Sequence, residues 1–248
     1  MAKRKRVLAL IATGVSLLFA SSAGAAFPNF SDCPRSSVNE CVDIQSVSGS
    51  LEIKGFTVPL GQSLEIRGGF RTETEPPTFV PVTGTTGFFS RSIRVPGGLL
   101  GLEFWIPGNE VLAIAQLAGS PSSIVLSIGN PTTIRIPLKV KLENPILGGS
   151  CYIGSNSNPA RMNLTTGTTS PPPPNRPITG NVGELRFEGN TLIIRNSTVV
   201  DNAFAVPGAT GCGLLGIASP LVNLRLGLPS AAGNNTSILT NNIAFTEP

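Results

Sequence analysis

Short runs in which apolar and polar residues alternate recur along much of the chain, at 51–54, 64–67, 93–95, 102–106 and 124–128. A period of two places every second side chain on the same face of an extended strand. Gly and Pro residues, which favour turns, stand between the runs. Apolar residues stand at odd positions up to Ile53 and at even positions from Phe56 onward, on either side of Gly55. Such a shift in the alternation predicts a β-bulge. The pattern as a whole predicts a series of half-buried β-strands.

The longest alternating run extends from Thr132 to Glu143. One face is apolar throughout and consists of Ile134, Ile136, Leu138, Val140 and Leu142. The other face is mostly basic, with Pro137 in its middle. Because proline lacks a backbone N–H, we expect either an edge strand or a strand broken by a bulge. The basic face favours a solvent-exposed edge over a ligand-binding stripe.

A hairpin is predicted where Gly189-Asn190 separates two alternating runs that begin at Glu184 and end at Arg195. A two-residue turn of this type is typical of tight β-hairpins. The resulting register pairs Phe187 with Leu192. It also sets Glu184 against Arg195 as a cross-strand ion pair.

One short helix is predicted near the C-terminus, with Ser219 as N-cap, Pro220 at the first helical position and Gly227 at the end. Leu221, Leu224 and Leu228 are then expected to face the core. The alternative is an apolar loop over the same residues.

These elements predict an all-β fold, a β-sandwich-like domain in which two packed sheets bury their apolar faces against each other. Few short helices accompany the strands. The region 27–248 forms either one large domain or two packed β lobes, at 27–143 and 144–248.

The first 26 residues have the pattern of a secretory signal peptide. Lys3–Arg6 form a basic start, Val7–Ala20 an apolar core too short to span a bilayer comfortably, and Ala23–Ala26 a small-residue cleavage site. An uncleaved membrane anchor is the alternative. Four of the 18 basic residues and none of the 14 acidic residues lie in this segment, which leaves 14 of each sign. The exported chain therefore has no net charge to favour nucleic acid or an anionic membrane.

All four cysteines follow the cleavage site, and an even number in an oxidising compartment predicts two disulfides. Of the three pairings, we favour Cys33–Cys41 and Cys151–Cys212, which join neighbours within each half. Zinc is the alternative, but without histidine it needs all four thiolates, and no two cysteines have the CxxC spacing.

The absence of histidine excludes Ser-His-Asp and Cys-His hydrolases and histidine-ligated metals. No phosphate-binding loop, GxSxG or zincin motif is present. A pair of glutamates remains for hydrolysis, either Glu73 with Glu75 or Glu184 with Glu188. We expect ordinary solvated carboxylates at both places, and therefore no catalytic residue and no cofactor.

Trp105 is the single tryptophan. In the alternating run 102–106, Leu102 and Phe104 share one face of the predicted strand, and Trp105 lies on the opposite face. An exposed tryptophan can stack on a sugar ring, which makes Trp105 the one candidate ligand-binding residue. The alternative is that Trp105 lies in the core of a second sheet.

Four segments carry a resemblance to a known group of proteins: NPILGGSCYIGS at 144–155, LTTGTT with its proline run from 164, GCG at 211–213 and GLPSAAG at 227–233. In these segments the chain resembles a family of secreted actinobacterial proteins with no assigned activity. The likeness is strongest from Pro137 onward. It implies export and a bacterial cell-exterior setting, and it favours a non-enzymatic role.

Three functions follow as hypotheses. The first is a secreted, non-enzymatic protein with a structural or binding role at the cell envelope, with cell-wall glycan or another envelope component as partner. The second is a carbohydrate- or lipid-binding module. The third is a secreted hydrolase that uses a pair of glutamates.

Overall fold

The computed structural model describes residues 26–248 except 105, 122 and 127–130. The chain order of its elements is η1 (Arg35–Ser37), β1 (Glu40–Ile53), β2 (Phe56–Pro59), β3 (Leu64–Arg71), β4 (Thr78–Pro81), β5 (Phe88–Ser90), β6 (Ile93–Arg94), β7 (Leu112–Leu117), β8 (Ser123–Val125), β9 (Thr133–Glu143), β10 (Tyr152–Ile153), β11 (Ala160–Thr165), β12 (Glu184–Glu188), β13 (Thr191–Asp201), β14 (Ala209–Thr210), η2 (Leu214–Gly216), α1 (Ser219–Leu226) and β15 (Asn235–Thr246). The all-β prediction is confirmed.

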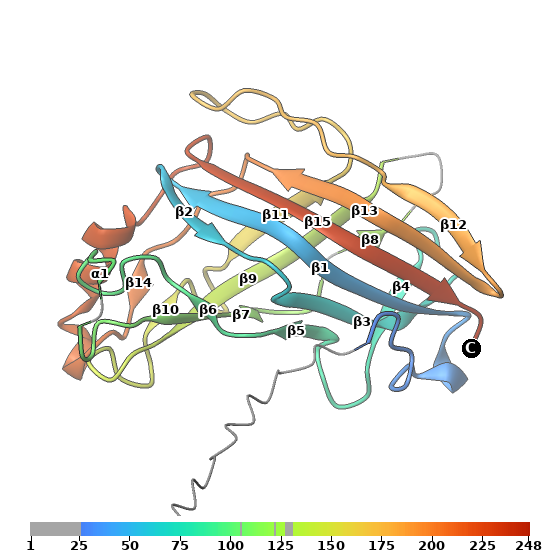
Figure 1. Ribbon diagram of the computed structural model, residues 1–248, viewed down its shortest axis with the longest axis horizontal. Coiled ribbons are helices and arrows are strands. Elements are labelled where there is room, and N and C mark those ends of the chain that lie inside the picture. Colours follow the sequence, from blue (N-terminus) through green and yellow to red (C-terminus); the bar gives the residue numbers. More distant parts are fainter. Residues whose placement is uncertain (1–25, 105, 122, 127–130) are drawn as a thin grey trace, which may run out of the picture.

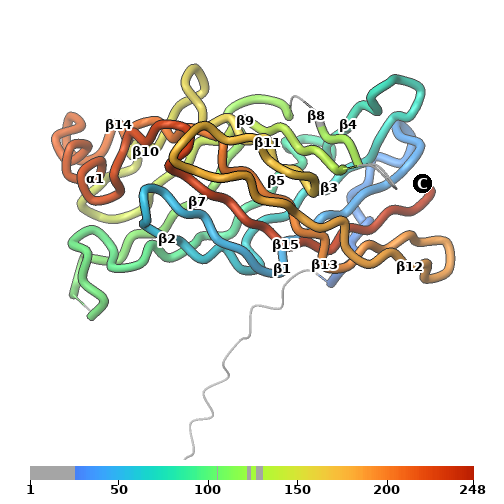
Figure 2. The backbone as a smooth tube through the Cα atoms, turned by 90° about the horizontal axis from the view of Figure 1, so that it is seen from above, coloured from blue at the N-terminus to red at the C-terminus, as the bar shows by residue number. Residues whose placement is uncertain are grey.

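Within the described residues the fifteen strands form one antiparallel sheet, with the main order β14-β10-β9-β11-β13-β15-β1-β3-β4. The long strands β1, β15 and β13 lie side by side (Figure 1). The sheet curves strongly, so that β5 approaches β7, and the backbone N–H of Ala115 donates to Ser90 Oγ at 3.2 Å. The apolar faces therefore meet through curvature of one sheet, seen from above in Figure 2, and not across the two separate sheets that the sequence predicted.

The core lies inside this curve and follows from the alternation. Every second residue of β1, β9 and β15 points inward, which buries Val42 and Ile44, Ile134 and Ile136, and Leu239 and Ile243. One contiguous cluster of buried apolar side chains joins these strands to α1 through Val222 and Leu226. Burial of apolar area is the main stabilising term of such a fold.

Strand β9 is not an edge strand, so that part of the prediction is wrong. It pairs with β10 and β11 on one side and with β7 and β8 on the other. Pro137 is tolerated because β7 ends at Leu117 and β8 begins at Ser123, which leaves a break in the partner strands beside the proline. There the Pro137 carbonyl accepts from Ala118, and the missing N–H leaves no hydrogen bond unmade.

The predicted hairpin is confirmed, with Phe187 opposite Leu192 and Glu184 opposite Arg195. The ion pair is different from the one expected, because the Arg195 guanidinium lies 3.6 Å from Glu188. The predicted bulge at Gly55 is also wrong. Ile53 pairs with Phe56, so Lys54 and Gly55, both at positive φ, form the two-residue turn of a hairpin between β1 and β2.

Helix α1 forms where the sequence predicted a helix, but with the opposite orientation. Val222 and Leu226 are buried, whereas Leu221 and Leu224, two of the three expected core residues, are exposed. The third, Leu228, is buried just after the helix as predicted. Ala218 is the N-cap, and the Ser219 hydroxyl accepts from the backbone of Cys212 instead of capping the helix. The left-handed conformation of Gly227, with φ of 66°, ends the helix as predicted.

Both predicted disulfides are present, Cys33–Cys41 and Cys151–Cys212. The first ties the N-terminal segment to β1, and the second ties the start of β10 to the segment before α1. No helix in the described part of the chain is long and apolar enough to cross a membrane. The division into lobes at 143/144 stays a prediction.

Candidate binding surface

Exposed apolar side chains gather at one end of the molecule. Of thirteen large hydrophobic residues that are exposed in the described part of the chain, nine lie on three segments near α1: Leu100, Leu102, Phe104, Ile146, Leu214, Leu215, Ile217, Leu221 and Leu224. We call these nine residues the apolar end. The segments that carry them lie together at the left of Figures 1 and 2.

The three segments of the apolar end contact one another. Arg225 of α1 donates from Nη2 to the carbonyl of Pro96 at 3.2 Å, which joins the helix to the loop that carries Leu100. The backbone of Gly213 donates to the Leu147 carbonyl at 2.7 Å, which joins the turn that carries Ile146 to η2. The segments that carry the nine apolar residues are therefore joined directly to one another.

Asparagine side chains hold each of these segments in shape. Asn109, buried, donates to the carbonyls of Gly97 and Leu102 and accepts from the backbone of Leu100. Asn144, also buried, bridges the carbonyls of Gly108 and Glu110 and accepts from Ile146.

Asn223 fastens α1 to the sheet, since its side chain accepts from the backbone of Ala209 at 2.6 Å and donates to the carbonyl of the same residue at 3.2 Å. Together, the hydrogen bonds of the three asparagines fix the backbone conformation of the segments that carry the apolar end.

The chain also holds one leucine in a conformation that suits glycine. Leu215 has a φ of 54° and is 94% exposed, between Gly213 and Gly216, which also have positive φ. A left-handed conformation costs a non-glycine residue about 1–2 kcal/mol. Around it, the run 202–224 contains no charged residue. The fold thus exposes the Leu215 side chain to solvent although its backbone conformation is unfavourable for leucine.

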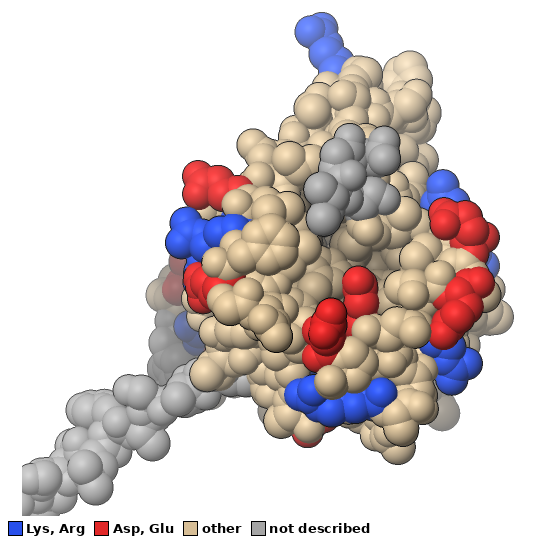
Figure 3. Space-filling model, turned by 90° about the vertical axis from the view of Figure 1, so that its right-hand side faces the viewer, with Lys and Arg blue, Asp and Glu red and all other residues tan. Residues whose placement is uncertain are grey.

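The opposite end of the molecule has a different surface. Figure 3 views that end, where side chains of both signs gather around the rim. The exposed apolar residues that the hairpin β12–β13 carries, Leu185 and Phe187, share β12 with Glu184, Arg186 and Glu188. On this hairpin, charged side chains therefore stand between the exposed apolar residues.

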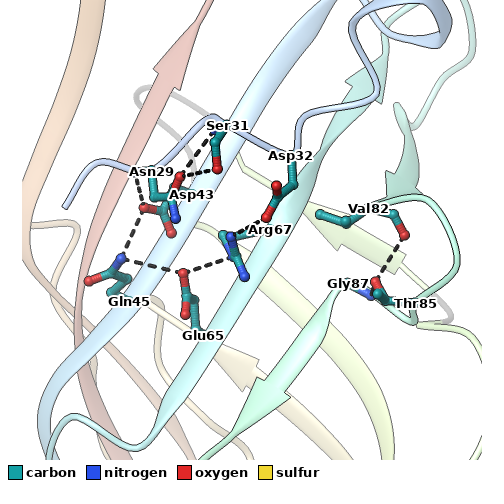
Figure 4. Close-up of polar contacts among 10 residues, drawn as sticks. All are labelled: Asn29, Ser31, Asp32, Asp43, Gln45, Glu65, Arg67, Val82, Thr85 and Gly87. Atoms are coloured by element: carbon teal, nitrogen blue, oxygen red, sulfur yellow. Dashed lines mark hydrogen bonds and ion pairs between the residues drawn. The ribbon is translucent and has the colours of Figure 1, made fainter. Parts of the chain in front are cut away.

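A polar cluster lies on the outer face of β1 and β3, beneath the N-terminal segment (Figure 4). Arg67 makes ion pairs with Asp32 at 2.7 Å and with Glu65 at 3.0 Å. Asp43 accepts from the backbone of Asn29 at 2.7 Å and from the Gln45 amide at 3.1 Å. The cluster, with the Cys33–Cys41 disulfide beside it, holds the N-terminal segment against the sheet.

Burial raises the pKa of Asp43 from 3.8 to about 7. The Asn29 backbone hydrogen bond lowers it, the charge of Glu65 raises it, and Arg67 and Gln45 lower it. Such a pKa suits a general acid, but Asp43 is fully buried, so a substrate cannot reach its carboxyl group. The polar cluster around Asp43, which we call the clamp, therefore holds the N-terminal segment against the sheet through Asn29 and Asp32.

The residues singled out for chemistry do not come together. Glu73 and Glu75 are exposed in the loop between β3 and β4, and Glu184 and Glu188 are exposed on β12. Among the described residues, no group of three or more cysteine, aspartate or glutamate side chains is arranged to hold a metal ion. Trp105 lies outside the described residues, so its proposed role in ligand binding stays a prediction.

Sequence reasoning missed both the apolar end and the Asp43 cluster. It assigned Leu221 and Leu224 to the core because a single apolar helix gives no sign of which face is covered. The sequence did contain a signal for the burial of Asp43. Asp43 and Gln45 share one face of a strand, and the Cys33–Cys41 disulfide can hold the preceding segment over that face.

Comparisons of the chain with protein-family models, with curated proteins and with solved structures found no match.

Proposed function

We propose that the protein is exported and acts without catalysis at the cell envelope, where the apolar end attaches it to a lipid surface. The observation that carries this proposal is the concentration of nine of the thirteen exposed large hydrophobic residues at one end. Contiguous exposed apolar patches on soluble proteins mark interaction sites.

Lipid suits this surface better than a charged partner does. Three of its leucines, Leu214, Leu215 and Leu224, are 79%, 94% and 83% exposed, and projecting side chains of this kind can enter hydrocarbon without burying charge. The nine side chains together hold more apolar carbon than one myristoyl chain, which alone gives marginal, reversible membrane binding. The apolar end therefore supplies enough area for attachment by itself.

The N-terminal signal pattern and the two disulfides support export, since disulfides form and persist outside the reducing cytoplasm. The exposed glutamates and the missing histidine support a role without catalysis.

Attachment is tested with vesicles of neutral phosphatidylcholine and protein exported through its own N-terminal segment. We expect the protein to sediment with the vesicles equally at about 0.1 M and about 1 M salt, since no charge attraction is involved. Leu215→Ser with Leu224→Ser should weaken partitioning roughly 100-fold, at about 1.5 kcal/mol for each leucine.

The matched control is Leu185→Ser with Phe187→Ser at the opposite end, which should leave partitioning unchanged. The proposal is wrong if both double variants bind equally, if salt abolishes binding, or if the protein binds cell-wall glycan and not vesicles. Recovery of the chain with residues 1–26 still attached would contradict the export part.

A further inference from the structure

An apolar cavity of about 120 Å³ lies inside the curve of the sheet. Its walls come from strands on opposite sides of the curve and from α1, with Leu51 of β1, Leu138 of β9, Met162 of β11 and Leu226 of α1 among them. Nineteen of the twenty lining residues are apolar, and the remaining one is Ser237.

Ser237 is a buried hydroxyl without a partner. It lies on β15, where burial alternates and Ser237 faces inward like Leu239, and only 1% of its surface is exposed. No described group makes a hydrogen bond with Ser237 Oγ. Its neighbour on β13, Asp201, takes its hydrogen bonds from the backbones of Asn163 and Ala203. The Ser237 hydroxyl is therefore free to form a hydrogen bond with a molecule in the cavity.

The lining decides what can occupy this space. A buried water needs two to four polar partners, and the lining side chains offer one hydroxyl. A charged ligand would lose its hydration with no lining side chain of opposite charge to replace it. Cavities of about this size accept a ring of about six heavy atoms. A neutral apolar body with one hydrogen-bonding group matches both the walls and Ser237.

We infer that the cavity is a binding site for a small neutral apolar molecule that carries one hydroxyl or carbonyl group, which bonds to Ser237. The site needs no lipid surface, so the inference is independent of attachment by the apolar end. Because Leu226 lines the cavity while Leu224 of the same helix is exposed, α1 is a wall shared by the cavity and the apolar end.

The single internal methionine provides a direct probe. The sequence has two methionines, Met1 and Met162, and Met162 lines the cavity at 8% exposure. In protein labelled with [methyl-13C]methionine, we expect cyclohexanol to shift the Met162 methyl resonance saturably. Cyclohexane should bind more weakly, and the cyclohexanecarboxylate anion should leave the resonance unchanged.

Two variants separate the walls from the hydroxyl. Ser237→Ala should lower the affinity for cyclohexanol about fivefold, because one hydrogen bond is lost. The affinity for cyclohexane, which forms no hydrogen bond, should be unchanged. It should fold at least as well as the parent, since it removes an unpaired buried hydroxyl. Ala113→Leu, in the wall, should abolish binding of both, whereas Ala205→Leu, at an exposed position, should leave both affinities unchanged.

Absence of a saturable shift with either compound in the folded parent protein would overturn the site. Equal affinity of cyclohexanol for the parent and for Ser237→Ala would overturn the role assigned to the hydroxyl. Since vesicles are absent from this experiment, either result leaves the attachment test unaffected.

Discussion

Asp43 illustrates how one residue in this fold changes its chemistry through burial. In the unfolded chain its carboxyl group loses a proton near the ordinary value of 3.8, whereas in the folded protein its pKa is about 7. The folded state therefore binds more protons than the unfolded state between these values, and stability falls as pH rises through this window. Burial raises the pKa of Asp201 as well, which acts in the same direction.

We expect Asp43→Asn to flatten the decline of stability between about pH 4 and pH 7, by up to about 1.4 kcal/mol per pH unit. Urea unfolding at a series of pH values measures this effect. Glu184→Gln, at an exposed position on β12, is the control and should reproduce the parent profile. A parent-like pH profile for Asp43→Asn would show that the folded protein does not hold this proton.

At the scale of elements, short polar side chains decide the shape of the segments that regular structure does not reach. The loop before β7 has no ladder of its own, and Asn109 satisfies two of its carbonyls and one of its N–H groups. Asparagine fits this role because one amide supplies both donors and an acceptor. The exposed side chains of Leu100 and Phe104 therefore project from a braced loop.

Asn109→Ala should lower the free energy of unfolding by about 2–3 kcal/mol, since it leaves buried backbone groups unpaired. It should also weaken vesicle partitioning, because the loop that carries Leu100 and Phe104 loses its bracing. Asn156→Ala, at an exposed position that only accepts from Lys139, should change stability by less than about 0.5 kcal/mol. Equal stability of the two variants would mean that Asn109 does not brace the loop.

At the scale of the whole molecule, one continuous sheet joins the N- and C-terminal parts of the chain. Strand β15, near the C-terminus, lies between β1 and β13. The core consequently closes only when the C-terminal strand is in place. The two disulfides contribute unequally to this architecture, since one spans 61 residues and the other 8.

In the chain-entropy description, Cys151→Ala with Cys212→Ala should lower the free energy of unfolding by about 4 kcal/mol. Cys33→Ala with Cys41→Ala should lower it by about 2.5 kcal/mol, because the closed loop is shorter. Urea unfolding of the two double variants gives the comparison. A larger loss for the shorter loop would mean that the clamp around Asp43 contributes more than loop closure does.

The sequence by itself determined the elements whose signals are local. Alternation located β9, the Gly189-Asn190 turn set the register of β12 and β13, and the cysteine positions allowed the correct disulfide pairing. The strand and the hairpin depend on backbone geometry and on residues close together in the chain, so a short window of sequence contains their cause. The disulfide pairing, which includes a span of 61 residues, followed instead from the small number of possible pairings.

Only the tertiary structure decided which surfaces are covered. It places β9 inside the sheet, where a break between its partner strands β7 and β8 accommodates Pro137. It also turns Leu221 and Leu224 of α1 outward, because Val222 and Leu226 meet the core. It also buries Asp43 and leaves Ser237 unpaired beside a cavity. Each outcome depends on which residues far apart in the chain become neighbours, and the free energy of burial is a property of those neighbours.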